Sequence, residues 1–296
     1  MVYLDEFCLP SLRAEESYLN SFRRTCFDSY YPFRFFSYDK QLTKVEFDDI
    51  TIFCGGNGSG KSTLLNIIAE KLHLKRETPY NKTYFFDPYI ELCNSNWDDL
   101  GETQKYDLSK ASRIVTSDDV FRHILDVRRR NEDLDFKRNL VFEQNDDALE
   151  RPRSIHFDDP KSVQNYIDYY NRQRLSDSQY TRRFLGVDER TYSNGENGFK
   201  YFTDVIQPGG LYLLDEPENS LSAELQLQLG QFLLNMTRFY KCQFVMSSHS
   251  PFLLSIPFAK IYNIDNEPVS TCKWTELPNV RIYYVFFKQH ESEFDV

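Results

Sequence analysis

Residues 55–63 constrain the fold of this chain more than any other segment. They read Gly-Gly-Asn-Gly-Ser-Gly-Lys-Ser-Thr and lie between two apolar runs, Ile50 to Cys54 and Leu64 to Leu72. The first run has the length of a buried strand and the second that of a helix, which places a glycine-rich turn directly before a helix N-terminus. Glycines let successive backbone N–H groups turn inward, and the helix adds the positive end of its dipole. This turn is therefore predicted to hold phosphate groups.

The same segment supplies two side chains with the chemistry of a nucleoside triphosphate site. Lys61 is expected to reach the β- and γ-phosphate oxygens, and the Ser62 hydroxyl is expected to ligate Mg²⁺. A glycine-rich turn without a ligand is the alternative, and the flanking strand and helix disfavour it. The remaining contacts to the nucleotide are predicted from Gly55, Asn57, Gly58, Ser59, Gly60 and Thr63.

A further apolar run, Gly210 to Leu214, is closed by two carboxylates, Asp215 and Glu216. A short run of this kind predicts a strand buried on both faces, with the acids at its C-terminal end. Behind a phosphate loop, Asp215 is placed to hold Mg²⁺ directly or through water, and Glu216 to orient and deprotonate the attacking water. An ordinary acidic pair at a strand end is the competing interpretation, which the upstream loop disfavours.

Two more segments flank the acidic strand. Ser193 and Gly195 lie in a polar turn before a predicted helix, Phe199 to Ile206. A serine hydroxyl, a bare backbone N–H and a helix N-terminus together make an anion site, although an ordinary N-cap has the same residue types. Downstream, the apolar run Gln243 to Ser247 predicts another buried strand, which leads into His249.

The order of these segments resembles that of the ABC-type ATPases. Ser193 and Gly195 match the serine and the second glycine of that family's signature, while Asn194 and Glu196 replace its usual first glycine and its glutamine. This form of the signature is more similar to the RecF and SMC branch than to transporter subunits. The resemblance covers the chain from about residue 42 onward and is weak over the first forty residues.

The resemblance implies roles for these residues. The signature would cap the γ-phosphate of ATP bound to the other subunit, His249 would be the switch histidine that contacts the γ-phosphate, and Glu218 to Ser222 corresponds to the D-loop. It also implies a homodimer in ATP, with ATP and Mg²⁺ as cofactors. Each composite site would join Lys61, Ser62, Asp215, Glu216 and His249 of one subunit to Ser193 and Gly195 of the other, with Glu216, His249 and Lys61 as the catalytic residues.

The implied fold is α/β, a P-loop NTPase of ABC-ATPase type with a mostly parallel central sheet flanked by helices. We expect a single domain over residues 1–296, with one lobe from about residues 1–90 and 200–296 and an inserted helical lobe from about 91–199. A capping box at Thr116 to Asp119 is expected to start a helix in that lobe. The other predicted elements are an amphipathic helix, Ala223 to Tyr240, a strand, Lys260 to Ile264, and a β-like segment, Val280 to Phe287.

Two parts of the site stay open. No glutamine stands out as the Q-loop, whose place is assigned near Ser117. Phe36, Tyr38 and Phe47 are all candidates for an aromatic residue that stacks on adenine.

Composition limits the partners of this chain. Its 45 acidic residues exceed its 35 basic ones, and the net charge of −10 disfavours sequence-independent DNA binding by the whole surface. The stretch 128–183 interleaves arginines with tyrosines and is either solvated surface or a contact for DNA or an acidic partner. No apolar stretch approaches the ~20 residues of a membrane span, so we expect a cytoplasmic location. The six scattered cysteines include no C-x-x-C pair and are expected to be reduced thiols.

These inferences leave three functions open. The first is an ATP-binding and ATP-hydrolysing switch, DNA-associated or part of an anti-phage defence, that works with a nuclease or another effector protein. The second is the cytosolic ATP-binding subunit of an ABC transporter, which the form of the signature disfavours. The third is a scaffold that hydrolyses ATP too slowly for turnover to matter.

Overall fold

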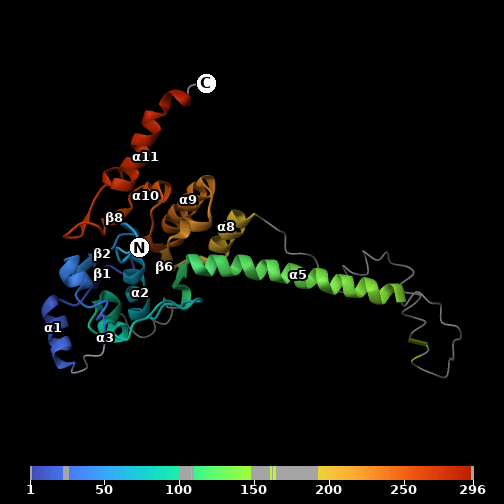
Figure 1. The fold of residues 1–296 in the computed structure, drawn as a ribbon, viewed down its shortest axis with the longest axis horizontal. Helices are drawn as coiled ribbons and strands as arrows, with labels where there is room; N and C mark the ends of the chain where they lie inside the picture. The colour runs from blue at the N-terminus through green and yellow to red at the C-terminus, as the bar shows by residue number, and fades with distance from the viewer. Residues whose placement is uncertain are drawn as a thin grey trace. The chain divides into compact units, whose positions relative to one another are not determined.

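A six-stranded sheet organises the fold in the computed structural model (Figure 1). Its strand order is β5-β6-β7-β3-β8-β9, and all neighbours pair in parallel except β8 and β9, which are antiparallel. The strands are β3 (Ile50–Cys54), β5 (Arg113–Thr116), β6 (Gly210–Asp215), β7 (Cys242–Ser247), β8 (Lys260–Asn263) and β9 (Ser270–Thr271). Every residue of β3 and β7 is buried, as in parallel sheets that are covered on both faces. The predicted α/β class with a mostly parallel sheet is confirmed.

The structure describes residues 2–22, 27–99, 108, 110–147, 161, 163–164 and 193–294. These divide into two compact units, Met1–Phe121 with Asn194–Val296, and Arg122–Ser193. The first unit carries the whole sheet, including β5, which lies inside the range that the sequence analysis assigned to the inserted lobe. Strand β5 therefore belongs with the sheet and not with an inserted lobe, because it pairs with β6 in parallel register.

A second, smaller sheet connects the N-terminal segment to the first unit. It has the order β2-β1-β4, all antiparallel, and is formed by β1 (Glu6–Cys8), β2 (Lys44–Glu46) and β4 (Asn94–Ser95). The fully buried Gln243 of β7 accepts hydrogen bonds from the backbone N–H groups of Tyr3 and Leu4, both at 2.9 Å, through its Oε1. The N-terminal segment is thus attached directly to the central strand that leads to His249.

Helices pack on the sheet through its alternating side chains. Leu211 and Leu213 of β6 join a core cluster with Leu64 and Leu65 of α2, whereas Tyr212 stacks on Phe244 of β7. Because successive strand residues point to opposite faces, α2 covers one face. The helices are α1 (Leu12–Ser21), α2 (Lys61–Lys71), α3 (Phe86–Glu91), α5 (Ser117–Asp147), α8 (Asn194–Val205), α9 (Ala223–Tyr240), α10 (Pro251–Leu254) and α11 (Pro278–Gln289), with single π- or 3-10 turns at η1 (Phe35–Asp39), η2 (Asn96–Asp99), η3 (Pro217–Ser220), η4 (Trp274–Glu276) and η5 (Glu291–Glu293).

The predicted helix Ala223 to Tyr240 and the predicted capping box are confirmed. Asp119 Oδ2 accepts from the Thr116 N–H at 2.7 Å, and Thr116 Oγ1 accepts from the Asp119 N–H at 3.4 Å, where α5 begins. Within the part of the chain that the structure describes, no helix is long and apolar enough to cross a membrane.

Two predicted elements need correction. The segment Val280 to Phe287 is not β-like but forms most of α11, a helix that starts with Pro278 at its first position. A proline there needs no N–H donor and has a helical φ, so it favours a helix over a strand. In addition, α8 begins at Asn194 and not at Phe199, which puts Gly195 in the first turn of the helix.

Candidate nucleotide site

The phosphate loop lies between β3 and α2, as predicted. Gly58 and Gly60 have φ values of 78° and 97°, a region that favours glycine. At Gly60, a Cβ atom would also collide with the ring of Phe35. The loop borders a cavity of about 280 Å³ whose lining residues are Tyr31, Asn57, Gly58, Gly60, Lys61, Ser62, Thr63 and Glu216.

Lys61 is held inside the loop. Its side chain is only 4% exposed, and Nζ donates to the backbone carbonyls of Gly55 at 2.8 Å and Gly56 at 3.0 Å. The loop is anchored from outside by Asp265, whose Oδ2 accepts from the Gly56 N–H at 2.7 Å. An ammonium at this position is available to phosphate oxygens at the cavity wall once it exchanges its carbonyl partners.

The predicted metal ligands meet across the sheet edge. Ser62 Oγ donates to Asp215 Oδ1 at 2.9 Å, and Ser247 Oγ donates to the same oxygen at 2.6 Å. Burial raises the pKa of Asp215, and the two hydroxyl donors act in the opposite direction.

A hydroxyl and a carboxylate oxygen form a hard donor set of the kind that Mg²⁺ prefers when substrate phosphates and water complete its shell. No group of three or more His, Cys, Asp or Glu side chains that could hold a metal by itself occurs among the described residues. The donor pair itself fits an ion shared with a nucleotide, which Ser62 and Asp215 would hold on the protein side.

Glu216 stands beside Asp215 in a constrained backbone conformation. Its φ of 47° is left-handed, and its N–H donates to the Ser247 carbonyl at 3.2 Å and to Ser247 Oγ at 3.0 Å. The side chain has two neighbours: His249 Nε2 lies 3.5 Å from Oε1, and Asn219 Nδ2 donates to Oε2 at 2.9 Å. The pKa of Glu216 is lowered to about 2, chiefly by His249, with burial acting against it. The carboxylate is therefore ionised at neutral pH.

The strand order explains why these residues meet. Strand β7 lies between β3 and β6, so the phosphate loop after β3, the acidic pair at the end of β6 and His249 after β7 all emerge at one edge of the sheet. Ser117 follows β5, whose last residue pairs in register with Asp215, and so lies at this edge as well.

The signature residues lie elsewhere on the chain. At Gly195, in the first turn of α8, a Cβ atom would come within 2.9 Å of Leu225 Cδ1, so the end of that side chain would have to move. Ser193 immediately precedes the helix and is exposed. Neither residue lines the cavity at the phosphate loop of its own chain.

Four residues that shape the site had no individual role in the sequence analysis, although Glu218 and Asn219 were placed in the D-loop. Ser247 contacts both carboxylate residues, Asn219 holds Glu216, and Asp265 anchors the loop, as described above. The fourth, Glu218, is mostly buried, and its Oε1 accepts from Ser248 Oγ at 2.9 Å, the His249 N–H at 2.6 Å and the Ser250 N–H at 3.1 Å. Burial raises the pKa of Glu218. For Glu218 and Asn219 the signal was the resemblance to the D-loop, and for Ser247 it was the end of a predicted strand.

The adenine candidates do not lie at the cavity. Phe36 and Phe47 are core residues, and Tyr38 is 65% exposed. Instead, Tyr31 lines the cavity and donates through its hydroxyl to Thr63 Oγ1 at 2.6 Å. Its place in a run of aromatic residues gave no signal of this contact.

The basic stretch is described only in part. Arg128, Arg129 and Arg130 lie on α5, and on the same helix Arg138 forms an ion pair with Asp135 at 3.0 Å. The arginines from 151 to 183 lie outside the described residues.

Comparison with known proteins matches residues 82–255, more than half of the chain, to the family described as "AAA domain, putative AbiEii toxin, Type IV TA system". The chain belongs to this family. The matched segment contains the acidic pair of β6 and His249, and the phosphate loop precedes it. Membership of this AAA-domain family agrees with the predicted identity as an ABC-like P-loop ATPase that binds ATP.

Among solved structures, one match is a dimeric ATP-binding cassette protein in a post-hydrolysis state, bound to ADP and Pi. The two chains are 14% identical with a TM-score of 0.36, and the match covers 78% of this chain and 88% of the other. No curated protein sequence matches this AAA-domain chain.

Proposed function

We propose that this AAA-domain chain is a molecular switch that hydrolyses ATP with Mg²⁺ and dimerises head to tail around two ATP molecules. The observation that carries the proposal is the convergence of five side chains at one sheet edge, beside a cavity at the N-terminus of α2. They are Lys61, Ser62, Asp215, Glu216 and His249. A lysine, two oxygen ligands, an ionised carboxylate and a histidine are the groups that phosphoryl transfer requires from a protein.

The phosphate loop would bind the triphosphate through its backbone N–H groups and Lys61. On binding, Nζ would leave the carbonyls of Gly55 and Gly56 and donate to β- and γ-phosphate oxygens. Ser62 and Asp215 would exchange their mutual hydrogen bond for positions on the metal. When bound, Mg²⁺ would neutralise charge that develops between the β- and γ-phosphates.

Glu216 would act on the attacking water. Its carboxylate would orient the water and accept one of its protons as the water oxygen bonds to the γ-phosphorus. The bond between the γ-phosphorus and the β–γ bridging oxygen would break, and ADP would leave with that electron pair. His249, which lies 3.5 Å from Glu216 Oε1, would turn toward the γ-phosphate and report its presence to the loop that Glu218 holds.

The second subunit would complete each site with Ser193 and Gly195 at the N-terminus of α8, where the helix dipole favours an anion. ATP would then close the dimer and hydrolysis would open it. The description of the family names a putative toxin of a type IV toxin–antitoxin system. A role in defence, with a nuclease or another effector as partner, is part of this proposal. Contact of residues 128–183 with DNA is part of this proposal.

The variant Glu216→Gln tests the switch, because the amide keeps the shape of the side chain but is a poor proton acceptor. We expect ATP to bind, turnover to fall by about 10²–10⁴-fold, and the dimer dissociation constant to be at least tenfold lower with ATP and Mg²⁺ than without nucleotide. A dilution series in the analytical ultracentrifuge measures this constant. The exposed Glu16→Gln on α1 is the matched control. Unchanged self-association on adding ATP would refute the dimer, and unchanged turnover would refute the role of Glu216.

A further inference from the structure

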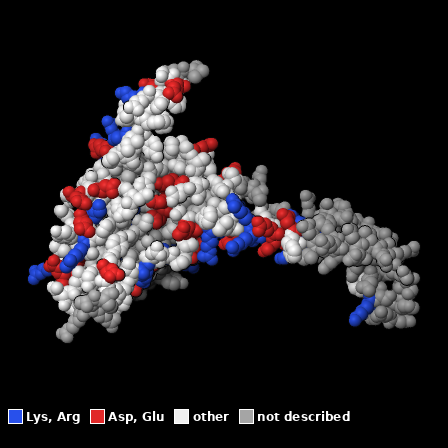
Figure 2. All heavy atoms as spheres, in the orientation of Figure 1, with Lys and Arg blue, Asp and Glu red and all other residues white. Residues whose placement is uncertain are grey.

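Helix α11 is apolar around its whole circumference. Between Arg281 and Lys288 it carries six large apolar residues in succession, and each is at least 46% exposed: Ile282, Tyr283, Tyr284, Val285, Phe286 and Phe287. Figure 2 shows this helix, at the top of the view, as a largely uncharged surface with charged side chains at intervals. A helix of this composition is normally covered by protein, because contiguous exposed apolar surface of this size is rare on monomers.

The beginning of α11 is fixed to the nucleotide site. Leu277 and Val280 are buried, and Asn279 Nδ2 donates to the His249 carbonyl at 3.2 Å. The apolar side chains that follow are therefore presented from an anchored helix.

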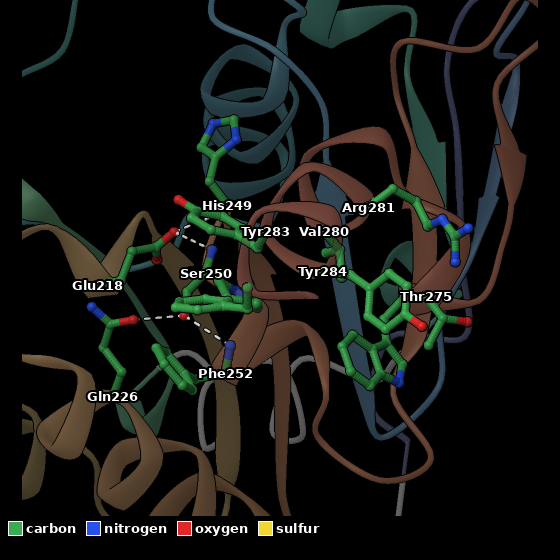
Figure 3. A pocket seen from close by; sticks show the side chains of 13 residues that line it. Glu218, Gln226, His249, Ser250, Phe252, Thr275, Val280, Arg281, Tyr283 and Tyr284 are labelled. Carbon is green, nitrogen blue, oxygen red and sulfur yellow. Dashed lines mark hydrogen bonds between the residues drawn. The ribbon is translucent and has the colours of Figure 1, made fainter. Parts of the chain in front are cut away.

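One face of α11 borders a groove. A first cavity of about 700 Å³ lies between α11 and the loop after β7, and Figure 3 shows Glu218 and Gln226 on one side of it and Arg281 and Tyr284 on the other. A second cavity, of about 510 Å³, continues along α11 toward Glu291. Both cavities are lined by Tyr284 and Phe287, so the groove follows one face of the helix.

The charges along this groove are self-complementary. Arg281, Tyr284 and Lys288 are spaced by three and four residues, which places them on one side of α11. Glu291, in the turn η5 that follows, lines the same cavity as Tyr284 and Lys288. Positive charge stands at the start of this segment and negative charge at its end. A second copy laid antiparallel about Phe286 would bring Arg281 opposite Glu291 of the other chain, and Tyr284 opposite Lys288, with each contact occurring twice.

We propose that α11 is a dimerisation helix whose occupant is the antiparallel α11 of a second copy of this chain. An aromatic side chain buries about 150–250 Å². One partner helix contacts one side of α11, so it would cover chiefly Tyr284 and Phe287, whereas Ile282 and Phe286 lie on the opposite side. Covering their exposed halves and parts of their neighbours would remove on the order of 200–300 Å² per chain from water. A total of roughly 400–600 Å² is below the size of standard interfaces, so the dimer is a weak one. It needs no nucleotide and does not depend on the proposed function.

Charge reversal tests the register. Without nucleotide, Arg281→Glu alone and Glu291→Arg alone should each raise the dimer dissociation constant about ten- to thirtyfold, because two attractive contacts per dimer become repulsive. The chain with both reversals should regain the wild-type constant within about threefold. Sedimentation over a dilution series measures the constants, and circular dichroism checks that each variant is folded. Rescue by the double reversal is a result that a purely structural role of either residue would not produce.

A matched aromatic pair tests the surface itself. Phe287→Ser, in the groove, should abolish self-association, whereas Phe239→Ser, at an exposed position near the end of α9, should leave it unchanged. A wild-type chain that stays monomeric without nucleotide would overturn the proposal, as would single reversals that leave the constant unchanged or a double reversal that does not restore it. Because these measurements contain no ATP, such a result leaves the head-to-tail dimer in ATP untouched.

Discussion

Replacing Ser247 by alanine removes a hydroxyl that hydrogen-bonds a proposed metal ligand, Asp215. Both proposed ligands, Ser62 and Asp215, stay in place. Ser247 is fully buried at the end of β7, and its Oγ donates to Asp215 Oδ1 at 2.6 Å while accepting from the Glu216 N–H at 3.0 Å. The Glu216 N–H keeps the Ser247 backbone carbonyl, at 3.2 Å, as a partner in the variant. The main loss therefore falls on the orientation of Asp215.

The size of the effect follows from that lost bond. A hydrogen bond to a charged group contributes about 1.5–3 kcal/mol, and the loss of a residue that orients a metal ligand typically weakens metal binding by about 10–100-fold. These two figures agree, since each tenfold change corresponds to about 1.4 kcal/mol. Ser247→Ala should therefore raise the Mg²⁺ concentration for half-maximal ATP hydrolysis by about 10–100-fold.

The assay is a titration of ATPase activity with Mg²⁺, accompanied by a fluorescence titration of ATP binding in a metal chelator. Binding without metal should change by less than about threefold, because Lys61 and the loop are untouched. Ser255→Ala is the matched control, since Ser255 also loses one hydrogen bond, 2.9 Å to the Phe252 carbonyl, away from the metal site. An unchanged Mg²⁺ requirement in Ser247→Ala would refute the placement of the metal at Asp215.

Two further predictions concern the phosphate loop and the basic stretch. Lys61→Ala should abolish ATP binding in a fluorescence titration, because Lys61 is the one cation among the described residues that line the cavity. The exposed Lys75→Ala should bind ATP normally, and wild-type affinity in Lys61→Ala would disprove the loop assignment. Changing Arg128, Arg129 and Arg130 together to alanine should weaken DNA binding and flatten its salt dependence by up to about three units of log–log slope, with ATPase activity unaffected. The control is a triple change to alanine with the same charge loss at Arg13, Lys75 and Arg238. If both triple variants bind DNA with equal affinity across a salt series, then Arg128, Arg129 and Arg130 do not contact DNA.

The sequence predicted those parts of the fold that have a clear local pattern. The loop at residues 55–63 and the acids after β6 combine specific residue types with an adjoining apolar strand, and the helix Ala223–Tyr240 has a helical hydrophobic period. The resemblance to ABC-type ATPases implied that the loop, the acidic pair and His249 meet in one site, and the strand order places all three at one edge of the sheet.

The supporting residues could not be predicted in the same way. The contact of Ser247 with Asp215 depends on β7 lying beside β6. The residues of either strand do not indicate which strand lies beside it. The aromatic run from Ile282 to Phe287 favours a strand by propensity, yet it is helical because Pro278 starts a helix and the short strand β9 occupies the edge of the sheet. Tyr31 reaches the loop through tertiary packing alone.

The position of Lys61 has a consequence for how the chain distinguishes nucleotides. The ammonium is buried in the loop and bound to the carbonyls of Gly55 and Gly56. Its desolvation is therefore part of folding and adds no cost to nucleotide binding. In the proposed function, a diphosphate would meet the same prepared lysine at its β-phosphate as a triphosphate. The contacts that would distinguish ATP from ADP are then those to the γ-phosphate, from Nζ and from His249.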